Sequence, residues 1–286
     1  MINTTVVADG FEGIFFSVGE KKDKAVIVVS GSNGGMSLTK KCAEFYYENG
    51  IAALAVALFK TKGTQKNLDR VPIEFIESAV KWLKKQGYEK IGIDGTSKGS
   101  EIALLSATMF SDLSCVIARV PSYFVSEGLI ARGKSKKPSG TSCWSYNGEE
   151  IPFARYNSRK FNVPQIILKE KELNLLTVNR DKTVTEDTII PIEKINGSIL
   201  FLSSINDKVW PSYESSLYME NRLKEKSFSF PYKHVAFPTI SHAMLTEISI
   251  IYKLGFKSER QNVTQCAKER KQLADELLNW VSNVWN

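Results

Sequence analysis

The sequence predicts an α/β protein built on a mostly parallel central sheet. Apolar, β-branched runs of strand length alternate along the chain with segments whose apolar residues recur at helical spacing. Such alternation implies crossover units, and therefore parallel strands that are buried on both faces. The chain has 286 residues, 43% of them hydrophobic, so it can bury a core without disulfides or a zinc site.

The alternation is clearest in the first half of the chain and returns after residue 190. The strand-like runs lie at 25–29, 51–59, 90–94, 113–120, 198–202 and 233–237. The helical patterns lie at 38–49, 72–85, 101–109, 212–223 and about 263–284.

The stretch between the two halves, residues 121–190, is polar and rich in Lys, Ser and Asn. A structureless loop of that length is uncommon inside a domain unless it has a function. We therefore expect a single domain over residues 1–286, in which 121–190 is inserted over the sheet as a partial lid with some hairpin structure.

Charge and cysteine content exclude several classes of protein. The chain carries 38 Lys+Arg against 31 Asp+Glu, but its lysine-rich stretches, 21–24, 60–66 and 134–137, fall in separate predicted loops. They do not form the basic face that nucleic-acid binding needs, so they are either solvated loops or attract an anionic ligand such as a phosphate-bearing thioester. The four cysteines are scattered and only two histidines exist, so we expect free thiols, no metal and no cofactor.

Targeting signals are not recognisable in the sequence. No apolar run reaches the length of about 18 residues that a membrane helix requires. The N-terminus has neither the basic flank nor the apolar core of a signal peptide. We therefore expect a cytoplasmic protein without a membrane span that acts on a small-molecule substrate, and we make no prediction of its oligomeric state.

Residues 95–99 (GTSKG) form the most informative motif. They follow the predicted strand 90–94 and precede the predicted helix 101–109, which is the context that a G-x-S-x-G nucleophile elbow requires. The glycines allow a sharp turn that presents the Ser97 hydroxyl, and the Lys98 amide then lies at a helix N-terminus, where it can bind an oxyanion. The alternative is an ordinary glycine-rich turn.

A serine nucleophile needs a base and an orienting acid, in the chain order Ser, acid, His. His242 lies in the loop after the last predicted strand, where the base is expected, whereas His234 lies within that strand and is predicted to be structural. Asp207 follows the predicted strand 198–202 at the edge where active-site loops gather, and is the expected acid. The alternatives are a loop histidine without a role and a turn aspartate.

The loop at residues 30–35 (SGSNGG) follows the first predicted central strand and should supply the second oxyanion donor. Its glycines allow a backbone N–H to face the reacting carbonyl. By position we expect the amide of Ser32 to be this donor, followed by that of Asn33. A plain glycine turn is the alternative.

Aromatic residues of the insertion are candidates for an acyl pocket. Trp144 and Tyr146 are the candidate substrate-binding residues, and Phe153 and Tyr156 follow them in the sequence. A small satellite core beneath the lid explains the same residues equally well.

Beyond these motifs, an ordered set of segments is similar to one known family. The set is 71–75 (VPIEF), 97–101 (SKGSE), 146–152 (YNGEEIP), 190–197 (IPIEKING), 206–212 (NDKVWPS) and Ser241-His242. Over about residues 25–284 the chain resembles the C-terminal catalytic domain of the type-I acyl-CoA thioesterases and bile acid-CoA:amino acid N-acyltransferases. The resemblance implies an α/β-hydrolase fold with helices on both faces of the sheet, an acyl-CoA substrate, and a triad of Ser97, Asp207 and His242.

These residues predict a serine hydrolase that cleaves acyl thioesters through an acyl-enzyme. Hydrolysis is favoured over transfer to an amine because the resembling acyltransferases carry a cysteine where this chain has Ser97. A carboxylesterase or dienelactone-hydrolase-like enzyme that acts on small esters fits the same triad, and an acyl-CoA-dependent N-acyltransferase is a further alternative. A non-catalytic binding protein of the same fold is the alternative from another class.

Overall fold

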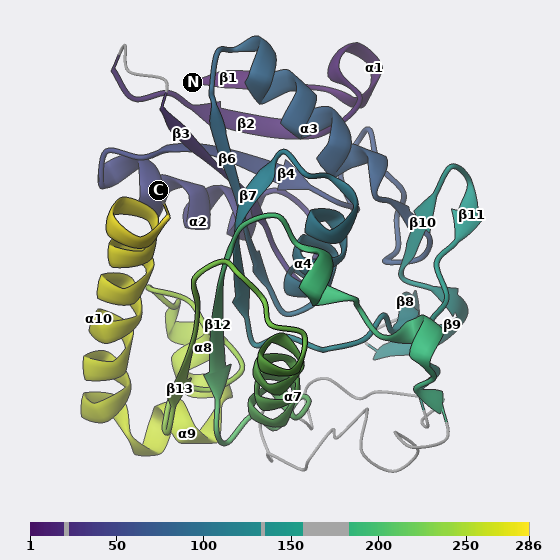
Figure 1. Ribbon diagram of the computed structural model, residues 1–286. Helices are drawn as coiled ribbons and strands as arrows, with labels where there is room; N and C mark the ends of the chain where they lie inside the picture. Colours follow the sequence, from purple (N-terminus) through teal and green to yellow (C-terminus); the bar gives the residue numbers. More distant parts are fainter. Residues whose placement is uncertain (20–22, 133–134, 157–182, 286) are drawn as a thin grey trace.

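The computed structural model describes residues 1–19, 23–132, 135–156 and 183–285. Its centre is an eight-stranded sheet in the order β1-β2-β4-β3-β6-β7-β12-β13 (Figure 1). The strands from β4 to β13 pair in parallel, whereas β1 (Ile2–Thr4) and β2 (Glu12–Phe16) join the sheet antiparallel. The predicted α/β class with a mostly parallel sheet is therefore confirmed.

The parallel strands coincide with the predicted apolar runs. They are β3 (Lys24–Val29), β4 (Ala52–Ala57), β6 (Lys90–Thr96), β7 (Leu113–Arg119), β12 (Ser198–Ser204) and β13 (Tyr232–Phe237). Every residue of β4 and β12 is buried, which explains why these sequences do not alternate between apolar and polar residues.

Helices cover both faces of the sheet, and each face has its own core (Figure 1). Alternate residues of one strand enter different cores, because Ile27 packs on one side of the sheet while Val26 and Val28 pack on the other. The first core is covered by α3 (Glu74–Lys85), α4 (Lys98–Met109) and α7 (Ser212–Glu225), and the second by α2 (Ser37–Glu48) and α10 (Val263–Asn279).

Several elements were not predicted or begin elsewhere than expected. The N-terminal β1, α1 (Val6–Asp9) and β2, and the two short helices α8 (Ile250–Gly255) and α9 (Lys257–Gln261), are additional. The helix expected from residue 72 starts at Glu74, because Val71–Pro72 forms a short strand, β5. A residue before proline favours extended backbone, so the proline marks the end of this strand. The last helix ends at Asn279 and continues as a π-helical turn, Trp280–Val284.

The predicted insertion contains antiparallel strand pairs. β8 (Glu127–Arg132) pairs with β9 (Ser135–Ser142), and β10 (Trp144–Tyr146) pairs with β11 (Glu149–Glu150) and also with β5. Two 3-10 turns, Glu186–Thr188 and Ile192–Lys194, lead back to β12. Residues 157–182 of the expected lid lie outside the described residues, so the single domain with a lid stays a prediction.

Candidate active site

Ser97 sits at a sharp turn between β6 and α4. Its backbone has φ 59° and ψ −119°, a conformation that strains a residue with a side chain. The flanking glycines allow the turn, because a Cβ on Gly95 would lie 2.0 Å from the Gly99 carbonyl oxygen and one on Gly99 would lie 2.6 Å from the Val29 carbonyl oxygen. Strand, turn and helix pack so closely that no side chain fits at either glycine.

His242 bridges Ser97 and Asp207. Its Nε2 lies 2.8 Å from Ser97 Oγ, and its Nδ1 lies 2.8 Å from Oδ2 and 3.0 Å from Oδ1 of Asp207. The three residues follow β6, β12 and β13, three parallel strands whose carboxyl ends share one edge of the sheet. The structure therefore brings the predicted nucleophile, base and acid into one hydrogen-bonded chain.

The Asp207 carboxylate is fixed by its own loop. Oδ1 accepts the backbone N–H of Val209 at 2.9 Å and of Trp210 at 3.3 Å, and Oδ2 accepts the Ser212 hydroxyl at 2.7 Å. The Asp207 side chain is 1% exposed, and the Trp210 ring packs edge-on against the His242 ring with centroids 4.9 Å apart. Sequence reasoning missed Trp210 and Ser212, although an aspartate that bonds an N–H two residues later is a recognisable local turn.

The glycine-rich loop after β3 packs directly against Ser97. A Cβ on Gly31 would lie 2.9 Å from Ser97 Cβ and 3.3 Å from Ser97 Oγ, so the loop approaches Ser97 as closely as glycine permits. Ser32 and Asn33, the expected oxyanion donors, are the next two residues, and the Lys98 amide is at the first position of α4. The amides of these three residues stay the predicted donors.

The side chains of Lys98 and Glu101 form a buried ion pair behind the elbow. Their side chains are 1% and 0% exposed, and Lys98 Nζ lies 3.2 Å from Glu101 Oε2. Lys98 also donates to the Ser126 hydroxyl and lies over the Tyr156 ring, 5.3 Å from its centroid. Glu101 accepts the Ser126 backbone N–H and the Trp144 Nε1–H, each at 2.8 Å. The pair, which sequence reasoning missed, thus ties α4 to the insertion.

The partners of Lys98 keep it charged. Burial lowers the pKa of Lys98, but Cys143 and Glu101 more than offset this and hold the pKa well above its ordinary value. Burial raises the pKa of the Cys143 thiol to about 12, so that thiol is neutral near pH 7. The charge that compensates Lys98 is therefore the Glu101 carboxylate.

Trp144 and Tyr146 lie in packed surroundings. Trp144 is 0% exposed and donates a hydrogen bond from Nε1 to Glu101. Tyr146 packs edge-on against Phe110, with ring centroids 6.1 Å apart. Phe153 is partly buried against the same core, and Tyr156 is 8% exposed. These aromatic residues thus join the core on one face of the sheet instead of forming a separate small core, and a substrate role for Trp144 and Tyr146 stays a prediction.

His234, the second histidine, takes no part in this hydrogen-bonded chain. Its Nε2 lies 2.7 Å from Ser203 Oγ, and its Nδ1 lies 3.6 Å from Glu220. Burial lowers its pKa, and the neighbouring Glu220 offsets only part of that effect. His234 therefore contacts Ser203 of the neighbouring strand β12. Its lowered pKa leaves the ring neutral near pH 7.

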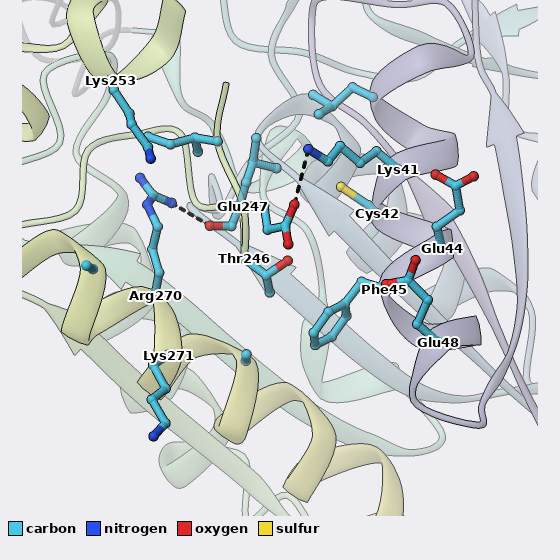
Figure 2. A pocket seen from close by; sticks show the side chains of 15 residues that line it. Lys41, Cys42, Glu44, Phe45, Glu48, Thr246, Glu247, Lys253, Arg270 and Lys271 are labelled. Carbon is cyan, nitrogen blue, oxygen red and sulfur yellow. Dashed lines mark hydrogen bonds and ion pairs between the residues drawn. The ribbon is translucent and has the colours of Figure 1, made fainter. Parts of the chain in front are cut away.

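A groove of about 610 Å³ lies between α2, α10 and the segment that follows His242 (Figure 2). In it Lys41 pairs with Glu247 at 3.3 Å, and Arg270 donates to the Leu245 carbonyl (Figure 2). Its lining includes neither Ser97 nor His242. The groove is thus separate from the candidate site.

Neither a metal cluster nor a membrane-spanning helix is present in the part of the chain that the structure describes. No cluster of three or more His, Cys, Asp or Glu side chains is placed to hold a metal ion there. Within the same residues, no helix combines the length and apolar character needed to cross a membrane.

The sheet order and the elbow define an α/β hydrolase. A putative dienelactone hydrolase from Klebsiella pneumoniae subsp. pneumoniae superposes with a TM-score of 0.58 at 16% identity, covering 98% of this chain and 97% of that one. Est1E from Butyrivibrio proteoclasticus, with bound ferulic acid, gives a TM-score of 0.52 at 16% identity, with 96% and 98% covered. At such identities the likeness establishes the fold alone.

Within this fold class, the chain belongs to the family described as "BAAT / Acyl-CoA thioester hydrolase C terminal", which matches residues 71–246. The matched range contains Ser97, Asp207 and His242. The family resemblance inferred from the sequence is therefore confirmed.

Curated relatives carry thioesterase names. The peroxisomal succinyl-coenzyme A thioesterase of Mus musculus is 24% identical over 234 residues, covering 80% of this chain and 51% of that protein. Acyl-coenzyme A thioesterase 2, mitochondrial, of Rattus norvegicus is 25% identical over 208 residues, covering 70% and 42%. The chain thus spans about half the length of these relatives. Their names refer to the peroxisome and the mitochondrion, and the expected cytoplasmic location stays a prediction.

Proposed function

We propose that this chain is a serine hydrolase that cleaves acyl-CoA thioesters, with Ser97 as nucleophile, His242 as base and Asp207 as orienting acid. The observation that carries the proposal is the His242 ring, which meets Ser97 Oγ and the Asp207 carboxylate through its two nitrogens at 2.8 Å each. The thioesterase names of the curated relatives support the choice of thioester over other acyl substrates.

In the first half of the proposed reaction, Ser97 Oγ attacks the thioester carbonyl carbon while His242 Nε2 takes the hydroxyl proton. Asp207 accepts the Nδ1–H, which fixes the tautomer of His242 and stabilises the imidazolium that forms. The oxyanion is bound by the backbone amides of Lys98 and Ser32, with Asn33 next to them. One such donor is worth about 3 kcal/mol of the barrier.

In the second half, the tetrahedral intermediate collapses and the C–S bond breaks. The CoA sulfur takes the proton from His242, so that CoA leaves as the thiol. A serine ester remains on Ser97. His242 then takes a proton from water, whose oxygen attacks the ester carbonyl, and the acid product leaves as Ser97 regains its proton. Water is the expected acceptor because a serine ester is a less reactive acyl donor toward amines than a cysteine thioester.

A substrate panel tests this proposal. Acyl-CoA esters and p-nitrophenyl esters of the same acyl groups are compared with wild type, Ser97→Ala and Ser111→Ala, an exposed serine ahead of β7 at the opposite edge of the sheet. We expect kcat on acyl-CoA to fall about 10⁴-fold or more in Ser97→Ala and to stay unchanged in Ser111→Ala. An unchanged rate in Ser97→Ala would contradict the proposed catalytic triad. Turnover of the p-nitrophenyl esters without turnover of acyl-CoA would mean that the enzyme is an esterase and not a thioesterase.

A further inference from the structure

Two lysines from separate stretches of the chain meet at the loop beside Ser97. Lys136, on β9, donates from Nζ to the carbonyl of Ser32. Lys60, which follows β4, donates from Nζ to the carbonyl of Asn33 at 3.5 Å. The two lysine-rich stretches that contain them are far apart in the sequence, and only the fold brings these two ammonium groups to adjacent carbonyls.

Among the described residues, no acid compensates the charges of this lysine pair. Within the described residues, neither Lys60 nor Lys136 forms an ion pair with a carboxylate. Burial, together with the neighbouring charge of Lys60, lowers the pKa of Lys136 to about 8. The fold therefore holds two cations together although they repel each other, and an anion between them would relieve that repulsion.

The pair lies close to the reacting atoms. Gly31 packs against Ser97, and Ser32, whose carbonyl accepts from Lys136, is the next residue in the chain. Successive Cα atoms are about 3.8 Å apart, so this chain of contacts places the ammonium of Lys136 at most about 14 Å from Ser97 Oγ. An anion bound there would be part of the molecule whose carbonyl reacts with Ser97.

We propose that Lys60 and Lys136 form an anion subsite for a carboxylate or phosphate that the thioester substrate carries. The proposal rests on the thioesterase function proposed above and specifies which substrates that site prefers. The anion has two chemical sources in such a substrate, namely a carboxylate at the far end of the acyl group and a phosphate of the CoA moiety. A purely structural role, in which the lysines only hold the loop, would instead affect all substrates alike.

Four substrates with the same scissile bond separate these cases. They are butyryl-CoA, glutaryl-CoA, and the butyryl and glutaryl thioesters of N-acetylcysteamine, which lacks phosphate. The kinetic constants kcat and KM are measured for wild type, Lys60→Met, Lys136→Met and Lys136→Arg. The matched control is Lys137→Met, because adjacent residues of a strand point to opposite faces.

We expect Lys60→Met and Lys136→Met each to lower kcat/KM about tenfold or more, through KM, on substrates that carry the relevant anion. Loss on both glutaryl thioesters identifies a carboxylate subsite, and loss on both CoA esters identifies a phosphate subsite. Butyryl-N-acetylcysteamine should change by less than about twofold, Lys136→Arg should retain most of the preference because it keeps the charge, and Lys137→Met should resemble wild type.

The proposal is overturned if the variants lose the same factor on all four thioesters, including the neutral one, or lose nothing on any of them. In either case wild type still hydrolyses these thioesters, so the proposed thioesterase function is retained and only the anion subsite is rejected. If wild type hydrolyses none of the four, the proposed function fails and the subsite falls with it.

Discussion

Two lysines near Ser97 have different surroundings. Lys98 lies behind the elbow, 1% exposed, and faces the carboxylate of Glu101 at 3.2 Å. Lys136 donates to the loop that packs against Ser97, is partly exposed and has a second lysine, Lys60, as its neighbouring charge. Glu101 compensates the charge of Lys98, whereas within the described ranges no carboxylate pairs with Lys136, so a substrate could bring the counter-charge.

The pKa values of Lys98 and Lys136 are shifted in opposite directions, which reflects this difference in surroundings. Burial lowers the pKa of both lysines, but Lys98 ends well above its ordinary value while Lys136 ends at about 8. Burial alone therefore does not decide the outcome, and the charge of the nearest group does. We infer that the Lys98–Glu101 pair stabilises the fold and that Lys60 and Lys136 serve the substrate.

The largest effect is expected where the compensated pair is broken. Glu101→Met leaves Lys98 charged and buried without its counter-charge and also removes the acceptor of the Ser126 N–H. We expect a loss of about 3–5 kcal/mol in the free energy of unfolding, measured by urea denaturation. Lys81→Met, which breaks the exposed Glu77–Lys81 pair on α3, is the control and should cost about 0.5 kcal/mol or less. A cost below about 1 kcal/mol in Glu101→Met would contradict the assignment.

Removing both charges of this pair should cost less than removing one. In Lys98→Met/Glu101→Met no uncompensated charge stays in the core, so the double variant should recover about 2 kcal/mol relative to Glu101→Met. The same urea denaturation measures it. Strict additivity of the two single effects would mean that the ion pair is not the interaction that these side chains share.

The pH dependence separates the two lysines in function. Because the pKa of Lys136 is lowered to about 8, this side chain loses its proton, and its charge, as the pH rises through that value. For the substrates that use the subsite, kcat/KM should fall up to about tenfold between about pH 7 and 9, since this parameter reports groups of the free enzyme. Lys136→Met should abolish the fall, and a fall that persists there would assign it to another group.

The smallest effect is expected on the free energy of unfolding when Lys136 is replaced. Lys136→Met removes a half-buried charge that faces Lys60 but also removes the bond to the Ser32 carbonyl. These opposing changes should leave the free energy of unfolding within about 1 kcal/mol of wild type near pH 7. A loss above about 2 kcal/mol would make Lys136 a structural residue like Lys98.

The sequence predicted the features that depend on local patterns. The positions of Ser97, Asp207 and His242 follow from one elbow motif and from two loops after parallel strands, and all three signals lie within short segments. The strand β2 and the two-residue β5 were missed because each exists through pairing with a distant strand, β4 and β10 respectively.

The side-chain environment of the site was less accessible from the sequence. Lys98 and Glu101 could be seen one helical turn apart, but their burial depends on Ser126 and Trp144 of the insertion. The lysine-rich stretches were recognised as candidates for anion binding, yet nothing in their spacing indicates that Lys60 and Lys136 reach neighbouring carbonyls.

Covalent labelling with a fluorophosphonate, followed by peptide mapping, tests most directly whether Ser97 is a nucleophile activated by His242. The account predicts a single adduct on Ser97 in wild type, no adduct in Ser97→Ala, slow labelling in His242→Gln and wild-type labelling in His234→Gln. An adduct on another residue, or equal labelling rates in the two histidine variants, would contradict it.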